Sequence, residues 1–569
     1  MRWGRSERDA PGQPSPQQAG SRGATTTPTR HGIIWLILAL MLSVLAFAGC
    51  RDRAISSTTG GVPFDPTGMD AVEIMDLLKR GTVTSTQLVG TYSDRIAKFD
   101  KAGPKLNSII AINPHARAQA EALDRERAAG KVRGLLHGLP IIVKDNYDVV
   151  GMPTTGGSVA LANAYPATNA AVVERMIHAG AIVLAKANMS ELATSAGKSG
   201  YSSVLGVTLN PYNLKRTSSG SSSGTASAIA ANFAGLGLGT DTFGSIRKPS
   251  SVTGLVGIRP TLGLTSRTGV IPSALSLDVT GPMALSVQDV ALALTVMAGT
   301  DADDPATAEA DARKHDYVAA LDSHALASAR IGVAVDFFGG NAEVDATVKQ
   351  AVNRMRELGT NVVEVPLPAW MSQLRSSVLG PLYDLEFKRD LEAYLATFPP
   401  GSPKTVADVI AISDSKGVRE SAHPVNPKLI DTLRKADEVS AAPDAASNRE
   451  RILHTEMPRV RQTLVDTFTQ LKLDALVFPT LKCPAPPVVT SEDTTFSCNA
   501  HNSYDRSLGG YVASAAGFPE VTVPVGHDSQ RLPIGISFLG LQYGEQRILD
   551  LAASFEQTSP TKDVPNAVS

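Results

Sequence analysis

The sequence predicts an α/β fold, in which one large domain is built on a mixed, twisted β-sheet with helices on both faces. Two observations predict it. Apolar strand-like segments alternate with segments of helical periodicity in the first half of the chain, which is typical of α/β proteins. Strand-like segments return near the C-terminal end, which favours one sheet with strands from both ends of the sequence. The chain has 569 residues, 43% hydrophobic and 19% charged, enough apolar content for a large core.

The individual elements follow from periodicity and from the residues that bound each segment. Helices are expected where apolar residues recur at helical spacing, and strands where a short apolar run is bounded by polar or turn-forming residues. In chain order the expected elements are helices at 70–81 and 85–99, a strand at 138–144, a helix at 170–179, a strand at 181–185, a helix at 225–234, strands at 474–480, 521–526 and 534–539, and a helix at 546–557.

The long middle part of the chain, residues 301–474, carries no recognisable catalytic motif. It is polar and contains helical patterns, such as those at 348–358 and 448–471. We expect this part to cover the cleft and to set specificity.

The first 50 residues have the composition of a targeting segment. An uncharged stretch at 32–50 ends in small residues before Cys50, which resembles a bacterial lipoprotein cleavage site with Cys50 as the lipid-bearing residue. An uncleaved anchor is the alternative, because an apolar stretch of this length is borderline for spanning a bilayer. Both predict an exported, membrane-anchored protein, either periplasmic or a cell-surface lipoprotein of a bacterium. Five arginines precede the stretch: Arg2, Arg5, Arg8, Arg22 and Arg30.

The predicted boundaries follow from this interpretation. Residues 1–50 are the signal peptide, and residues 51–66, rich in Ser, Thr, Gly and Pro, form a flexible linker. The catalytic domain is expected at 67–560, and a C-terminal tail at 561–569.

Cysteine usage and charge limit the function classes. Besides Cys50 the chain has Cys483 and Cys498, which an exported protein can join in a disulfide; two unrelated buried thiols are the alternative. No cluster has metal-ligand spacing, so no metal and no other cofactor is predicted. The net charge of −2 gives no reason to expect nucleic acid as a partner. A small or peptide-like substrate is expected.

Three separate segments together predict a hydrolytic site without histidine. Lys144 ends the apolar strand at 138–144, a Ser-Gly run occupies 218–224, and the segment 239–247 contains Ser245. A serine needs a neighbouring base to act as a nucleophile. A lysine can be that base if burial lowers its pKa toward neutrality.

These segments resemble the signature of the amidase signature family, and the bacterial peptide amidases most of all. The resemblance spans roughly residues 72–557 and includes Asn188 in Ala-Asn-Met-Ser-Glu and Pro519 in Gly-Phe-Pro. It implies that Ser245 is the nucleophile, Ser221 a bridging serine held by a cis peptide bond, and Lys144 the base. Backbone N–H groups of the loop are implied as the oxyanion hole, and three further side chains as supports. The oxyanion residues are Thr242, Phe243, Gly244 and Ser245, and the supporting residues are Ser222, Asp241 and Arg247.

The sequence departs from the family pattern at three loop positions. Phe243 stands where many members have glycine, and Ser219 and Ser223 replace glycines around Ser221. A side chain at position 243 restricts φ but leaves the backbone donors available if it points away from the pocket. The triad itself is intact.

The expected activity is hydrolysis of a carboxylic or peptide amide C–N bond through an acyl-enzyme. One alternative is an α/β-hydrolase-like esterase, because residues 220–224 match G-x-S-x-G with Ser222 as nucleophile and five histidines are available as base: His315, His423, His454, His501 and His527. Three S-x-x-K matches, at 195–198, 245–248 and 413–416, resemble penicillin-binding enzymes but lack K-T-G. The other alternative is an exported binding lipoprotein without turnover. Amidotransferase A subunits share the signature, but an export signal argues against their cytoplasmic role.

Overall fold

The computed structural model describes residues 64–194, 198–489, 495–500, 505–558 and 563–568. The predicted signal peptide, Cys50 and most of the linker lie outside these ranges. The compact unit begins at Phe64, and the described part of the predicted tail belongs to it, because Val568 is buried in the core and the amide of Ala567 donates to the carbonyl of Pro211. Within the described ranges, no helix has the length and apolarity needed to cross a membrane.

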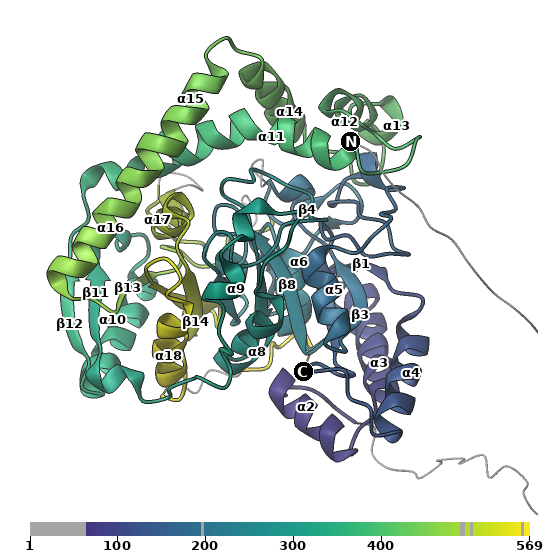
Figure 1. Ribbon diagram of the computed structural model, residues 1–569, viewed down its shortest axis with the longest axis horizontal. Coiled ribbons are helices and arrows are strands. Elements are labelled where there is room, and N and C mark those ends of the chain that lie inside the picture. The colour runs from purple at the N-terminus through teal and green to yellow at the C-terminus, as the bar shows by residue number, and fades with distance from the viewer. Residues whose placement is uncertain (1–63, 195–197, 490–494, 501–504, 559–562, 569) are drawn as a thin grey trace, which may run out of the picture. The chain divides into compact units, whose positions relative to one another are not determined.

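A mixed sheet of 11 strands runs through this unit and confirms the predicted fold class (Figure 1). In spatial order the strands are β1 Ile109–Ile112, β3 Ile182–Ala187, β2 Pro140–Lys144, β8 Leu236–Asp241, β10 Val279–Ala284, β9 Val256–Arg259, β14 Glu520–His527, β15 Pro533–Leu539, β13 Ala475–Pro479, β11 Arg330–Ala334 and β12 Asn361–Val365. Parallel pairs (β2 with β3 and β8, β11 with β12 and β13) are combined with antiparallel pairs in the centre. Two small sheets pair β4 Tyr201–Ser202 with β5 Gly206–Val207, and β6 Leu209–Asn210 with β7 Asn213–Thr217.

Helices cover both faces of the sheet, as strand β15 demonstrates. On one face, a Cβ at Gly535 would lie 2.7 Å from the hydroxyl of Ser251 in helix α7 (Arg247–Val252). On the opposite face, Phe538 packs on Phe555 of helix α18 (Glu545–Glu556). The α-helices are α2 Ala71–Arg80, α3 Ser85–Arg95, α4 Ala116–Ala128, α5 Ala171–His178, α6 Ser223–Ala230, α7 Arg247–Val252, α8 Val287–Met297, α9 Ala310–Arg313, α10 Ala342–Glu357, α11 Gly380–Leu395, α12 Val406–Ser413, α13 Lys416–Arg419, α14 Pro427–Ser440, α15 Ala445–Arg451, α16 Met457–Leu471, α17 Leu508–Ala516 and α18 Glu545–Glu556.

Several predicted helices have different limits in the structure. The helix expected at 85–99 is α3 followed by a π-helical segment, Ile96–Lys101, and the pattern at 348–358 is part of the longer α10. The helix expected at 225–234 ends at Ala230, because Asn232 adopts φ 51° and the amide of Phe233 closes the end on the carbonyl of Ala228. The pattern at 448–471 is divided into α15, a π-helical segment Ile452–Glu456 and α16. Pro458 at the start of α16 has no N–H to donate, so the regular helical ladder cannot run through this point.

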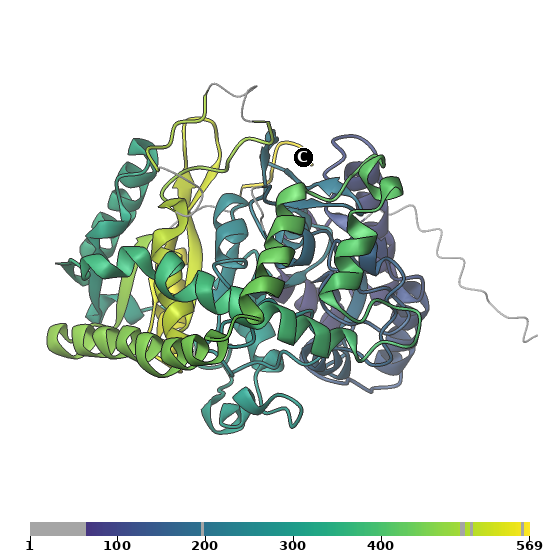
Figure 2. The ribbon, with the colours of Figure 1, turned by 90° about the horizontal axis from the view of Figure 1, so that it is seen from above.

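The helices α11 to α14 form a cap with its own apolar cluster. Figures 1 and 2 show these green helices gathered on one side of the unit, crossing near the N-terminal half of the sheet. Phe387, Leu391 and Leu433 pack in this cluster against Leu192 and Ile271 from the body of the domain. These helices therefore pack on the body of the domain, whereas β11 and β12, from the same middle part of the chain, join the sheet. That this part covers the cleft and sets specificity stays a prediction.

Candidate active site

Lys144 is the last residue of β2 and is completely buried. Its Nζ lies 2.8 Å from Oγ of Ser221 and donates to Oγ1 of Thr240 at 2.6 Å. Burial lowers the pKa of Lys144 to about 7, although the carboxylates of Asp241 and Asp278 act in the opposite direction. A large fraction of Lys144 is therefore neutral at physiological pH and able to accept a proton.

The loop that carries Ser221 is fixed by close contacts on both sides. The peptide bond between Gly220 and Ser221 is cis, as the family resemblance implied. The carbonyl of Ser221 accepts from the amide of Ser190 at 3.0 Å. A Cβ at Gly220 would lie 2.4 Å from Oγ of Ser190, so only glycine fits there. Ser219, which replaces a glycine, still adopts the left-handed conformation with φ 59°.

Ser245 lies between β8 and α7 and meets the Ser221 loop through the backbone. Its carbonyl accepts from the amide of Ser222 at 3.2 Å. The preceding residue, Gly244, has φ 99°, a conformation that favours glycine. Ser245 retains 6% exposure, whereas Lys144 has none. The structure thus brings Lys144, Ser221 and Ser245 to one site at the end of β2 and β8.

A buried ionic network supports the Ser245 loop. The carboxylate of Asp241 accepts from the amides of Gly244 and Ile246, at 2.8 and 3.1 Å, on either side of Ser245. It also accepts from both Arg247 and Arg259. Burial alone would raise the pKa of Asp241, but the two guanidinium groups hold it well below its ordinary value.

The network continues into the C-terminal half of the chain. Arg247 forms an ion pair with Glu520 of β14 at 2.5 Å and donates to the carbonyl of Gly510 and to Oγ of Ser514 in α17. Glu520 accepts in turn from the hydroxyl of Ser537. Asp241 and Arg247, which the sequence placed as supporting residues, therefore support the loop through contacts made by distant strands.

The structure narrows the predicted oxyanion hole. The amide of Gly244 is used by Asp241, so it is not available to an oxyanion. This is a correction to the set of four donors and leaves the amides of Thr242, Phe243 and Ser245. Thr242 is fixed from the opposite side, because its hydroxyl donates to the buried Asp278 at 2.6 Å.

The side chain of Phe243 points away from Lys144. Its ring makes an edge-on contact with Tyr383 of α11, with centroids 6.0 Å apart, and the guanidinium of Arg375 lies 4.8 Å from the ring centroid. The side chain therefore extends toward the helical cap, which agrees with the expectation that it points away from the backbone donors.

The described residues do not form the alternative serine sites of the G-x-S-x-G match at 220–224 and the S-x-x-K match at 413–416. Ser222 is completely buried, and its Oγ exchanges hydrogen bonds of 3.3 Å with the backbone of Thr240. In the described part of the chain no hydrogen bond joins it to a histidine. Ser413 ends α12, and Lys416 is exposed at the start of α13, beside Glu420. Ser195 and His501 lie outside the described residues.

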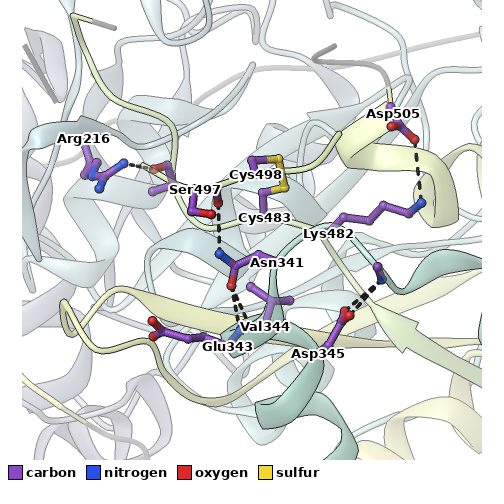
Figure 3. Close-up of a disulfide and its surroundings, with 12 residues drawn as sticks. Arg216, Asn341, Glu343, Val344, Asp345, Lys482, Cys483, Ser497, Cys498 and Asp505 are labelled. Carbon is purple, nitrogen blue, oxygen red and sulfur yellow. Dashed lines mark hydrogen bonds and ion pairs between the residues drawn. A yellow bond between two sulfur atoms is a disulfide. The ribbon is translucent and has the colours of Figure 1, made fainter. Parts of the chain in front are cut away.

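Cys483 and Cys498 are joined by a disulfide, with Cα atoms 5.6 Å apart (Figure 3). Asn341, which caps α10, donates to the carbonyl of Ser497 next to the bridge at 3.0 Å. The linked loop also pairs with β7, because the amide of Thr217 donates to the carbonyl of Pro486. Since β7 leads directly into the Ser-Gly run, the disulfide-linked loop supports the strand that precedes Ser221.

Several residues of the site were not singled out from the sequence. Thr240, Arg259, Asp278 and Glu520 each contact the loops that carry the triad. Thr240 adjoins Asp241, and Glu520 follows the Gly-Phe-Pro motif directly, so both lay beside recognised motifs. Within the described ranges, no three His, Cys, Asp or Glu side chains gather in a group that could hold a metal ion.

Comparison with known proteins decides the family. The model of the amidase family matches residues 87–549 of this chain. The chain belongs to the amidase family. Its activity class is therefore hydrolysis of amide C–N bonds.

Individual amidase relatives match over nearly their whole length. The structure of peptide amidase from Stenotrophomonas maltophilia is similar with a TM-score of 0.79 and 35% identity, covering 89% of this chain and 100% of that one. The structure of an amidase family protein from Bacillus anthracis is similar with a TM-score of 0.76 and 29% identity, covering 87% of this chain and 92% of that one. The A subunit of glutamyl-tRNA(Gln) amidotransferase from Acinetobacter baylyi is 32% identical over 504 residues, covering 85% of this chain and 95% of that protein.

The buried network gives a prediction about stability. Replacing Glu520 with Gln removes one of the two carboxylate partners of Arg247 while keeping nearly the same shape, and breaking a buried ion pair in this way typically costs about 3–5 kcal/mol. We expect a loss of free energy of unfolding in this range, measured by urea denaturation. Glu420→Gln, at an exposed pair, is the control and should change it by less than about 1 kcal/mol. Equal stability of the two variants would contradict the prediction.

Proposed function

We propose that this protein hydrolyses a small linear carboxylic or peptide amide through a Ser245–Ser221–Lys144 relay and an acyl-enzyme intermediate. The observation that carries the proposal is the 2.8 Å approach of the buried Lys144 amine to the hydroxyl of Ser221. A neutral amine that donates to Thr240 keeps its lone pair for a proton from Ser221. The relay therefore has a base without histidine or metal ligands.

The proposed reaction has two halves that use the same relay. Oγ of Ser245 attacks the amide carbon, its proton passes to Ser221, and the proton of Ser221 passes to Lys144. The tetrahedral oxyanion is held by backbone N–H groups from the set Thr242, Phe243 and Ser245, each worth about 3–4 kcal/mol in comparable enzymes. The C–N bond then breaks as the proton returns through Ser221 to the leaving nitrogen. Water attacks the resulting ester by the same route and releases the carboxylic acid.

The named relatives suggest two working contexts. The A subunit of glutamyl-tRNA(Gln) amidotransferase is by its name part of an enzyme that acts on a tRNA, whereas peptide amidase is named for a peptide substrate. We favour the second context for this chain. The disulfide between Cys483 and Cys498 supports this choice, because disulfides are rare in the cytosol, where tRNA is aminoacylated.

The first prediction concerns the nucleophile. We expect a serine-directed fluorophosphonate to modify Ser245 alone, because Ser221 is held by Lys144 and Ser222 by the backbone of Thr240. Mass spectrometry of the labelled peptide identifies the site, and Ser245→Ala is the matched control that should remain unlabelled. Modification of Ser222 with Ser245 intact would instead support the esterase alternative.

The second prediction concerns the base. Because Lys144 must be neutral to accept a proton and its pKa is about 7, kcat/KM should rise with pH through about 7 and then level. Lys144→Ala should lose several powers of ten in kcat and keep its fold by circular dichroism. Lys416→Ala, at an exposed position, is the control. A Lys144→Ala enzyme with full activity would exclude this mechanism.

The third prediction concerns location. We propose that the chain is exported and anchored through a lipid on Cys50, as the sequence around 32–50 indicates. Metabolic labelling with palmitate should mark the wild-type protein, which should fractionate with membranes, and Cys50→Ser should abolish the label. Cys483→Ser keeps Cys50 and serves as the control. Labelling that persists in Cys50→Ser would refute lipidation at this residue.

A further inference from the structure

A lysine that the catalytic relay does not use lies one helical turn after the nucleophile. Lys248 is in the first turn of α7, and its aliphatic stem crosses Gly244: a Cβ at Gly244 would lie 3.1–3.2 Å from its Cγ, Cδ and Cε. No other described residue forms a hydrogen bond or ion pair with its ammonium group. The carboxylate whose charge acts on it, Asp241, is already paired with Arg247 and Arg259.

A second cation reaches the same loop from the segment that leads into the helical cap. The guanidinium of Arg375, in the segment that precedes α11, lies 4.8 Å from the centre of the Phe243 ring. The charge of Arg375 is also among those that act on Lys248, and Lys248 in turn acts on Lys144. Two cations thus flank Phe243 and Gly244, the residues directly before the nucleophile. Lys248, Arg375 and Phe243 are all only partly buried.

The electrostatics of this region favour an anionic ligand. Burial lowers the pKa of Lys248 to about 8. The charges of Arg247 and Arg375 act in the same direction and Asp241 acts against them, so the cationic form is only partly compensated. A carboxylate placed between an ammonium and a guanidinium gains charge-assisted hydrogen bonds and relieves this repulsion. A neutral group placed there gains neither.

We propose that Lys248 and Arg375 form a subsite for a carboxylate on the substrate, so that the preferred substrates are amides carrying a carboxylate a few bonds from the scissile carbonyl. The inference rests on the proposed amide hydrolysis and specifies its substrate class. Lys248 and Phe243 lie on the loop and helix that hold Ser245, which limits the carboxylate to the neighbourhood of the reacting carbon. Arg375 belongs to the middle part of the chain, residues 301–474, which was predicted to set specificity.

The test uses two amides of nearly equal shape. Succinamic acid carries a carboxylate, and 4-oxopentanamide has a methyl ketone in its place. Ammonia release should give a kcat/KM for succinamic acid about tenfold or more above that of 4-oxopentanamide, since hydrogen bonds to charged groups contribute about 1.5–3 kcal/mol. Lys248→Met and Arg375→Met should each remove most of this preference, and Lys248→Arg should keep it. Lys416→Met is the control.

A binding measurement separates this inference from the proposed function. In Ser245→Ala, which cannot form the acyl-enzyme, calorimetry should show succinamic acid binding about tenfold or more tighter than 4-oxopentanamide. Adding Lys248→Met should abolish the difference. Hydrolysis of neither amide by the wild type would count against the activity proposed for these small substrates, but the binding experiment would still decide the subsite.

Two results would overturn the subsite. One is binding that does not depend on the carboxylate, whether or not either amide is hydrolysed. The other is an equal loss of kcat/KM for both amides in Lys248→Met, which would assign Lys248 to stabilising the oxyanion instead. Thermal melting of each variant verifies that the fold is retained.

Discussion

The arrangement of the active site depends on one buried carboxylate. Asp241 binds the amides on either side of Ser245 and faces two guanidinium groups, so the loop cannot move without exposing uncompensated charge in the interior. The loop conformation, including the left-handed Gly244, is therefore fixed by charge pairing as much as by packing. Ser245, the proposed nucleophile, is therefore held in position without a substrate.

Burial has the opposite effect on Lys144, whose cationic form lacks a carboxylate within hydrogen-bonding distance among the described residues. Asp241 and Asp278 raise its pKa from a distance, but removal from water outweighs them. One carboxylate is kept charged and one amine is brought close to neutrality within the same interior, because only the carboxylate has paired cations. In the proposed mechanism, this difference is what gives Lys144 the role that histidine has in other serine hydrolases.

Much of the site was predictable because its signals are local. Three segments have patterns that can be recognised without knowledge of the fold: the apolar run ending at Lys144, the Ser-Gly loop and the segment around Ser245. The roles of Arg259 and Glu520 could not be predicted, since they follow from which strands become neighbours in the sheet. For the same reason, the sequence could not predict that the Gly244 amide is unavailable as an oxyanion donor. That amide donates to the carboxylate of Asp241, a contact that exists only in the folded loop.

The ion pair between Arg247 and Glu520 joins residues 273 positions apart in the chain. Glu520 belongs to β14, which inserts between β9 and β15 near the centre of the sheet. During synthesis Lys144, Ser221 and Ser245 all leave the ribosome well before this strand does. Until β14 is present, Arg247 lacks Glu520, so the loop of the proposed nucleophile lacks this part of its support.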